Sequence, residues 1–206
     1  MTEAILINKI KARIDELEPF ADTDLNPDIE IVKAVINDNA ESFIMSIPGV
    51  LVTPTNFNGD TIHTQYQDGS GRVELPDDFL KMHTFKMQEW ERECVDFITP
   101  VDPKYKLQHN LVTRGGISKP VVVTKTDPAP GAIKYIYYYS CSDGTIPQAI
   151  ETAWYIPVVS ATSIQDNLAI PFVWYCAAEV LQILGQANLA EMARGKVQEF
   201  ILSLTR

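Results

Sequence analysis

The chain has 206 residues, of which 46% are hydrophobic and 21% are charged, a composition typical of a folded globular protein rather than a disordered one. This length suits one domain. Lys and Arg number 17 against 27 Asp and Glu, which gives a net charge of −10. Because such a surface repels phosphate and anionic lipid, the composition argues against tight, sequence-independent nucleic-acid binding.

The three cysteines are widely spaced and form no CxxC pair, which argues against a disulfide framework and against a zinc knuckle. We therefore expect the reducing cytosol as the compartment. The N-terminal segment lacks a basic stretch followed by a long apolar run, and no segment approaches the roughly twenty apolar residues that span a bilayer. The sequence thus predicts neither secretion nor a membrane span.

Two amphipathic helices are predicted at the N-terminal end. In residues 2–18 apolar side chains recur every three or four positions, which is the spacing of one helical face, and Pro19 ends the run. A second helix is predicted from Asn26, as the N-cap, to a stop at Pro48-Gly49. Because a short linker joins the two, we interpret residues 1–48 as a helical hairpin.

Residues 49–145 are predicted to be rich in β-structure. Gly, Asn, Asp and Thr dominate residues 49–71, which we interpret as loop with one short strand at 61–66. Four further strands are predicted from alternating or β-branched runs, at residues 80–90, 95–99, 120–125 and 133–140. Because turn-forming residues separate these runs, we expect a small antiparallel sheet or barrel.

Residues 146–206 are predicted to form an irregular arm followed by two helices. The apolar residues of 145–170 follow no clear period and two prolines interrupt them, so we expect short helical or extended pieces there. Stripes at spacings of three and four predict helices over 171–186 and 188–206. The predicted fold class is therefore α+β: N- and C-terminal helices forming a helical bundle, with an antiparallel β-sheet or barrel inserted between them, in a single domain.

The stretch VELPDDF places two carboxylates, Asp77 and Asp78, directly after Pro76. Adjacent side chains diverge, whereas a catalytic carboxylate pair must converge on one substrate. Proline fixes φ and a neighbouring carboxylate accepts nearby backbone N–H groups, so we interpret Leu75 to Phe79 as a capped corner with Phe79 in the core. The enzymatic alternative is a hydrolase that uses side chains of this one region: Asp77, Asp78, His83 and Cys94.

The remaining motifs have structural interpretations. The three histidines show no HxH or HExxH spacing, which argues against a metal site, and neither a GxSxG motif nor a phosphate-binding glycine loop occurs. The tyrosines of 135–139 suggest a base-stacking platform, but such platforms need a basic groove and only Lys134 is adjacent, so we interpret them as core plus interface. On a strand, Glu89, Glu91 and Glu93 would form one charged row, either solvated surface or the wall of an acidic channel.

The parts of the chain follow a specific order: a helical pair, then VELPDDFLKMHTF, PKYKL and SKPVVV, then the tyrosine-rich strand IKYIYYYS, then two helices. This order resembles the head-to-tail adaptor, or connector, proteins of short-tailed bacteriophages, including those of crAss-like phages. In that family an LPxDF corner opens the β part, as Leu75–Phe79 does here, and a tyrosine strand precedes the closing helix, as Tyr137–Tyr139 does. Residues 140–144 depart from the family's pattern, and residues 145–170 exceed it, which suggests an extra arm that reaches a neighbour.

The resemblance implies a non-enzymatic virion protein at the head-tail junction, assembled in the host cytoplasm without cofactor or membrane. Copies would close into a homo-oligomeric ring, as a rule of twelve, between the portal protein and a tail or second ring protein. DNA would pass through the acidic lumen without specific binding. Because C-terminal segments of the family insert into the portal, the portal contacts that the resemblance implies are Val197, Phe200, Ile201, Leu204 and Arg206.

Three other functions stay open at this point. Another head-completion or tail-terminator ring subunit would share the acidity and the ring but bind a different partner. The second is the hydrolase described above, and the third is a cytosolic binding module of the host, which no residue pattern requires.

Overall fold

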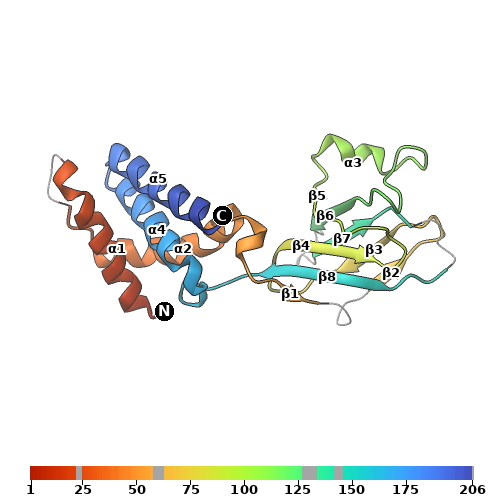
Figure 1. Ribbon diagram of the computed structural model, residues 1–206, viewed down its shortest axis with the longest axis horizontal. Helices are drawn as coiled ribbons and strands as arrows, with labels where there is room; N and C mark the ends of the chain where they lie inside the picture. Colours follow the sequence, from red (N-terminus) through yellow and green to blue (C-terminus); the bar gives the residue numbers. More distant parts are fainter. Residues whose placement is uncertain (22–24, 58–62, 127–133, 142–145, 206) are drawn as a thin grey trace. The chain divides into compact units, whose positions relative to one another are not determined.

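The computed structural model describes residues 1–21, 25–57, 63–126, 134–141 and 146–205. The chain forms two compact units (Figure 1): a helical unit of Met1–Thr53 and Val158–Arg206, and a β unit of Pro54–Pro157. Helices thus occupy both ends of the chain and strands its middle, which confirms the predicted α+β class.

The helical unit contains four helices and four short 3₁₀ turns in its described residues. The helices are α1 (Glu3–Leu17), α2 (Ile29–Ser46), α4 (Ala169–Ile183) and α5 (Ala187–Leu204). The 3₁₀ turns are η1 (Glu18–Phe20), η2 (Gly49–Leu51), η3 (Ala161–Ser163) and η4 (Asp166–Leu168). Helix α4 is buried on most sides because it packs against α1, α2 and α5. The central position of α4 explains why its sequence is so uniformly apolar.

The turn between α4 and α5 depends on Gly185. This residue has φ of +76°, a conformation that favours glycine. Its N–H donates to the Gln182 carbonyl, and the N–H of Gln186 donates to the Leu181 carbonyl. These two bonds make a Schellman motif, which satisfies the last carbonyl groups of α4 and reverses the chain so that α5 returns along it.

Helix α2 begins later than the sequence predicts. Its N-cap is Asp28 rather than Asn26, and the Asp28 carboxylate accepts a 2.9 Å hydrogen bond from the Glu30 N–H. Both side chains are able to cap a helix, and the predicted start placed Pro27 inside the first turn. Pro27 instead precedes the cap, and Ile29 lies exposed at the start of the helix.

The β unit contains two sheets and one short helix. The three-stranded sheet has the order β1 (Thr55–Asn56), β8 (Ile150–Pro157) and β4 (Phe79–Met87). The five-stranded sheet has the order β2 (His63–Gln65), β3 (Gly71–Glu74), β7 (Lys134–Tyr138), β6 (Val122–Thr126) and β5 (Phe97–Ile98). Helix α3 (Pro103–Leu107) lies between β5 and β6 in the chain. All described strand pairs are antiparallel except β5 with β6, which is parallel.

Both sheets contribute side chains to one core. Phe85 and Tyr155 come from the three-stranded sheet, and Ile136 and Tyr138 come from the five-stranded sheet. Trp90, in the turn after β4, meets the rings of Phe85 and Tyr138 edge-on, with centroids 5.6 and 6.2 Å away. The two sheets therefore pack face to face around an aromatic centre.

Several segments differ from the sequence-based expectation. Residues 145–170 were expected to hold short helical or extended pieces; their described part does include the short turns η3 and η4, but its extended piece is a full strand, β8, at the centre of its sheet. Strand β8 buries the consecutive residues Tyr155 and Ile156, so its pattern lacks strict alternation. Strand β4 shifts register three times against β8, which explains its imperfect sorting of polar and apolar residues. Finally, β4 ends at Met87, so Glu91 and Glu93 lie exposed in a turn and form no strand row.

Candidate functional site

The stretch Leu75–Phe79 forms a turn that leads into β4. The Phe79 N–H donates a 3.0 Å hydrogen bond to the Pro76 carbonyl, which closes the turn, and the side chains of Leu75 and Phe79 are buried. Asp78 Oδ1 accepts a 2.8 Å hydrogen bond from Tyr155 Oη of β8. Asp77 is exposed beside it. Asp78 therefore ties the turn to the neighbouring strand through a side chain, where the sequence had predicted a backbone cap.

The residues of the hydrolase alternative each make their own structural contacts and, among the described residues, share no hydrogen bond or ion pair with one another. The Cys94 thiol is buried and donates to the Asp96 carbonyl at 3.2 Å, and burial raises the pKa of Cys94 to about 11, so the reactive thiolate is disfavoured at neutral pH. Within the described part of the chain, His83 Nδ1 is buried without a hydrogen-bond partner. There, no hydrogen bond or ion pair joins His83 to Asp77, Asp78 or Cys94.

The described residues contain no group of three or more His, Cys, Asp and Glu side chains placed to hold a metal ion. None of their helices combines the length and the apolar character that crossing a membrane requires.

The tyrosine strand divides its side chains between the two faces of the five-stranded sheet. Tyr138 points into the core, whereas Tyr135 and Tyr137 are half-buried on the opposite face. Arg72 of β3 lies 5.1 Å from the Tyr135 ring centroid, and Lys125 of β6 lies 4.3 Å from that of Tyr137. Arg72 and Lys125 are distant from the tyrosines in the sequence, where only Lys134 is adjacent. Strand pairing of β3 and β6 with β7 brings the two cations close to the tyrosines. Since the cations already occupy ring faces, this surface is a set of cation–π contacts rather than an open stacking platform.

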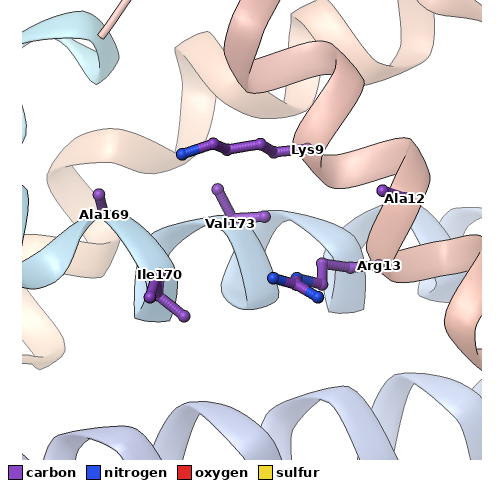
Figure 2. A pocket seen from close by; sticks show the side chains of 6 residues that line it. All are labelled: Lys9, Ala12, Arg13, Ala169, Ile170 and Val173. Carbon is purple, nitrogen blue, oxygen red and sulfur yellow. The ribbon is translucent and has the colours of Figure 1, made fainter.

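An open groove lies between helices α1, α4 and α5 of the helical unit, and it consists of two hollows that share Arg13. The first hollow has a volume of about 210 Å³ and is lined by Lys9, Ala12, Arg13, Ala169, Ile170 and Val173 (Figure 2). The second has a volume of about 370 Å³ and is lined by Arg13, Glu16, Trp174, Lys196, Glu199, Phe200 and Ser203. We call the two hollows together the helical groove.

The helical groove combines an apolar floor with cations. Figure 2 shows Lys9 and Arg13 reaching from α1 toward α4, with Val173 between them. Arg13 lies 5.4 Å from the Trp174 ring centroid and pairs with Glu16. Ile170 is 45% exposed, which is high for an isoleucine within a helical bundle. The floor is thus suited to an apolar side chain of a partner, and the cations are suited to its carboxylates, although acidic residues outnumber basic ones in this unit.

The residues expected to contact the portal have different environments. Val197 is only 7% exposed because the stripe of α5 that contains it packs into the bundle, so it belongs to the core and is not available as a surface contact. Phe200 is half-buried and lines the second hollow. Ile201 is half-buried and Leu204 is 38% exposed. Arg206 lies outside the described residues.

Sequence reasoning missed most of the helical groove. Its residues come from three helices at opposite ends of the chain, and no local pattern shows which exposed faces will be neighbours. The available signal was the pair Lys9 and Arg13, two cations four residues apart in the first helix, next to its apolar stripe.

No protein-family model matches this chain, and no curated protein sequence matches it significantly.

Proposed function

We propose that the protein is a non-enzymatic subunit of the adaptor ring that joins the portal to the tail of a short-tailed bacteriophage and extends the DNA channel. The observation that carries the proposal is the order of the parts. The two ends of the chain form the helical unit, and the β unit is inserted between them in the sequence. Among the described residues, the longest strand of the β unit, β4, begins at the end of the Leu75–Phe79 corner. This is the order that the resemblance to the adaptor family implies.

The structural contacts of the alternative catalytic residues favour a scaffold over an enzyme. Asp78 is engaged by Tyr155 at 2.8 Å, and the buried thiol of Cys94 is engaged by a backbone carbonyl. A hydrolase would instead need these groups to converge on a substrate. The proposal therefore assigns function to surfaces rather than to a reaction centre.

In the proposed ring, each surface has a separate task. The exposed end of α5, with Ile201 and Leu204, provides apolar contacts for the portal. The net charge of −10 disfavours adhesion of DNA, so a duplex passes during packaging and ejection without being held. Heterologous contacts between copies close the circle.

The proposal is tested by measuring binding to the portal protein of the same phage. We expect the unmodified chain to bind, and the double variant Ile201→Asp and Leu204→Asp to bind at least about tenfold more weakly, since charge placed in an apolar contact is left unpaired. Val101→Asp is the matched control, because Val101 is 91% exposed and lies in the β unit. Binding to a tail component but not to the portal would instead identify a head-completion or tail-terminator subunit.

A further inference from the structure

The first hollow of the helical groove presents two like charges that lack full compensation. Lys9 and Arg13 are four residues apart in α1, so they are neighbours on the helix surface, where like charges at this spacing repel. Glu16 compensates Arg13. Lys9 has no ion pair among the residues that the structure describes. Ile170 and Val173 of α4 are apolar side chains that line the same hollow. This hollow is therefore suited to a partner that is anionic and partly apolar.

Helix α2 carries the opposite arrangement on its exposed face. Its exposed residues at helical spacing are Glu30, Ala34, Asn37, Asp38, Glu41, Ser42 and Met45, which we call the α2 surface. Asp38 and Glu41 are three residues apart, so they also repel each other. In the described residues neither has an ion pair, whereas Glu30 is paired with Lys33 at 2.9 Å. Met45 lies one turn beyond Glu41 and is 53% exposed.

The sequence of the α2 surface lowers the stability of its own helix. Asn37, Asp38 and Asn39 occupy consecutive positions in the middle of α2, and both residue types have low helix propensity. The Asn39 amide donates to the Val35 carbonyl at 2.9 Å, so this side chain competes for backbone hydrogen bonds. Core packing does not require polar residues at the exposed positions of Asn37 and Asp38. Local costs of this kind are expected at functional surfaces.

The two surfaces complement each other in charge, spacing and polarity. Two carboxylates one helical turn apart match two cations one helical turn apart, and each like-charged pair relieves the repulsion in the other. We propose that the α2 surface of one copy docks in the first hollow of a second copy, with Asp38 and Glu41 facing Lys9 and Arg13, and Met45 covering Ile170. This inference rests on the proposed ring and names the contact between its subunits.

The symmetry of this contact fits a ring. The groove is lined by residues of α1, α4 and α5, and none of its lining residues comes from α2. In the proposed ring the contact is heterologous: each copy offers its α2 surface to one neighbour and its groove to the other, and repetition closes a circle when the rotation permits. Both surfaces belong to the helical unit, so the contact does not involve the β unit.

Carbodiimide cross-linking of isotope-labelled and unlabelled copies tests the contact directly. Carbodiimide joins a Lys amine to a carboxylate only where the two groups touch, and mixed labelling separates links between copies from links within one copy. We expect links that join a labelled to an unlabelled copy, from Lys9 to Asp38 or Glu41, at the highest protein concentration that gives no aggregation. Lys33 is the control, because its partner Glu30 is on its own helix and its links should carry a single label.

Charge reversal tests whether the linked groups stabilise the assembly. The variants Lys9→Glu with Arg13→Glu, and Asp38→Lys with Glu41→Lys, should each weaken self-association roughly tenfold in sedimentation experiments. All four substitutions in one chain should restore association, as should an equimolar mixture of the two double variants. Restoration excludes misfolding as the cause of the loss. Asp166→Lys, in η4 and outside both surfaces, should have no effect.

Three results separate the contact from the ring itself. If mixed-label links form elsewhere but never between Lys9 and the α2 surface, the contact is overturned and the ring stands. If the reversed variants assemble with the portal as the unmodified chain does, the contact is likewise overturned. If Lys9 links to the α2 surface of another copy but the chain does not bind the portal, the contact holds and the proposed function fails.

Discussion

Tyr155 Oη donates a 2.8 Å hydrogen bond to Asp78 Oδ1, which connects the turn before β4 to the central strand β8. Burial, followed by this hydrogen bond to Asp78, raises the pKa of Tyr155 to about 12, so the phenol remains the donor at neutral pH. The carboxylate that raised the question of catalysis thus has a structural partner.

Replacing Asp78 should therefore change stability. We expect Asp78→Ala to lower the free energy of unfolding by about 1 kcal/mol, because the Asp78 side chain is exposed and its hydrogen bond is only partly shielded from water. Asp77→Ala is the matched control and should cost less than about 0.5 kcal/mol. Urea denaturation of both variants and of Tyr155→Phe provides the measurement. Equal losses at Asp77 and Asp78 would contradict this interpretation of the corner.

Gly71 is expected to tolerate no side chain. It pairs with Tyr138 across strands β3 and β7, and a methyl group at Gly71 would overlap the Tyr138 phenol. We predict that Gly71→Ala lowers the free energy of unfolding by about 1–3 kcal/mol, the usual cost of overpacking a core. Gly116→Ala is the control, since a methyl group there meets no atom within 4 Å. A neutral Gly71→Ala would show that the ring moves aside freely.

His63 should make stability depend on pH. His63 Nε2 lies 2.6 Å from Tyr138 Oη, and burial lowers the pKa of His63 below its ordinary value of about 6.5. The folded state therefore binds a proton less tightly than the unfolded state. The stabilisation that uncharged His63 gives the folded state is complete at pH values above the pKa of histidine in the unfolded chain, about 6.5. It is lost as the pH falls from there toward the lower pKa of His63 in the folded chain.

The corresponding measurement compares the unmodified chain with His63→Gln between about pH 7 and pH 5. The free energy of unfolding should fall more steeply with acidification in the unmodified chain than in the variant. Parallel profiles would show that other groups, rather than His63, set the pH dependence in this range.

Gly195 offers a stabilising substitution. It lies inside α5, its φ is not positive, and a methyl group added there meets no atom within 4 Å. Gly195→Ala should raise the free energy of unfolding by about 0.5–1 kcal/mol because alanine loses less backbone freedom on entering a helix. Thermal or urea denaturation measures the gain. A loss of stability would mean that an interaction outside the described contacts uses this exposed position.

The sequence predicted the helices better than the strands. Stripes at spacings of three and four located α1, α4 and α5, because each of these helices buries one continuous face or most of its surface. Strand β8 was missed because Tyr155 and Ile156 are both buried and break the alternation by which half-buried strands are recognised. The bulges in β4 blurred the same signal. Local pattern fails where a strand is covered on both faces or shifts its register.

The surfaces were predicted less well than the fold. Val197 fits the apolar stripe of α5, and only the packing of α5 on α4 shows that the stripe is internal. The cations near Tyr135 and Tyr137 come from neighbouring strands, which the sequence does not place side by side. The helical groove needs α1 and α5, from opposite ends of the chain, to pack against α4. Such relationships depend on tertiary packing rather than on local propensity.

Native mass spectrometry of the protein, alone and mixed with the portal protein of the same phage, tests the central claim most directly. The adaptor proposal predicts a closed multimer, either for the protein alone or on the portal, with a mass that is a whole multiple of the 23.1 kDa chain. A chain that remains monomeric and leaves the portal mass unchanged would contradict the proposal and return attention to Asp77, Asp78 and His83.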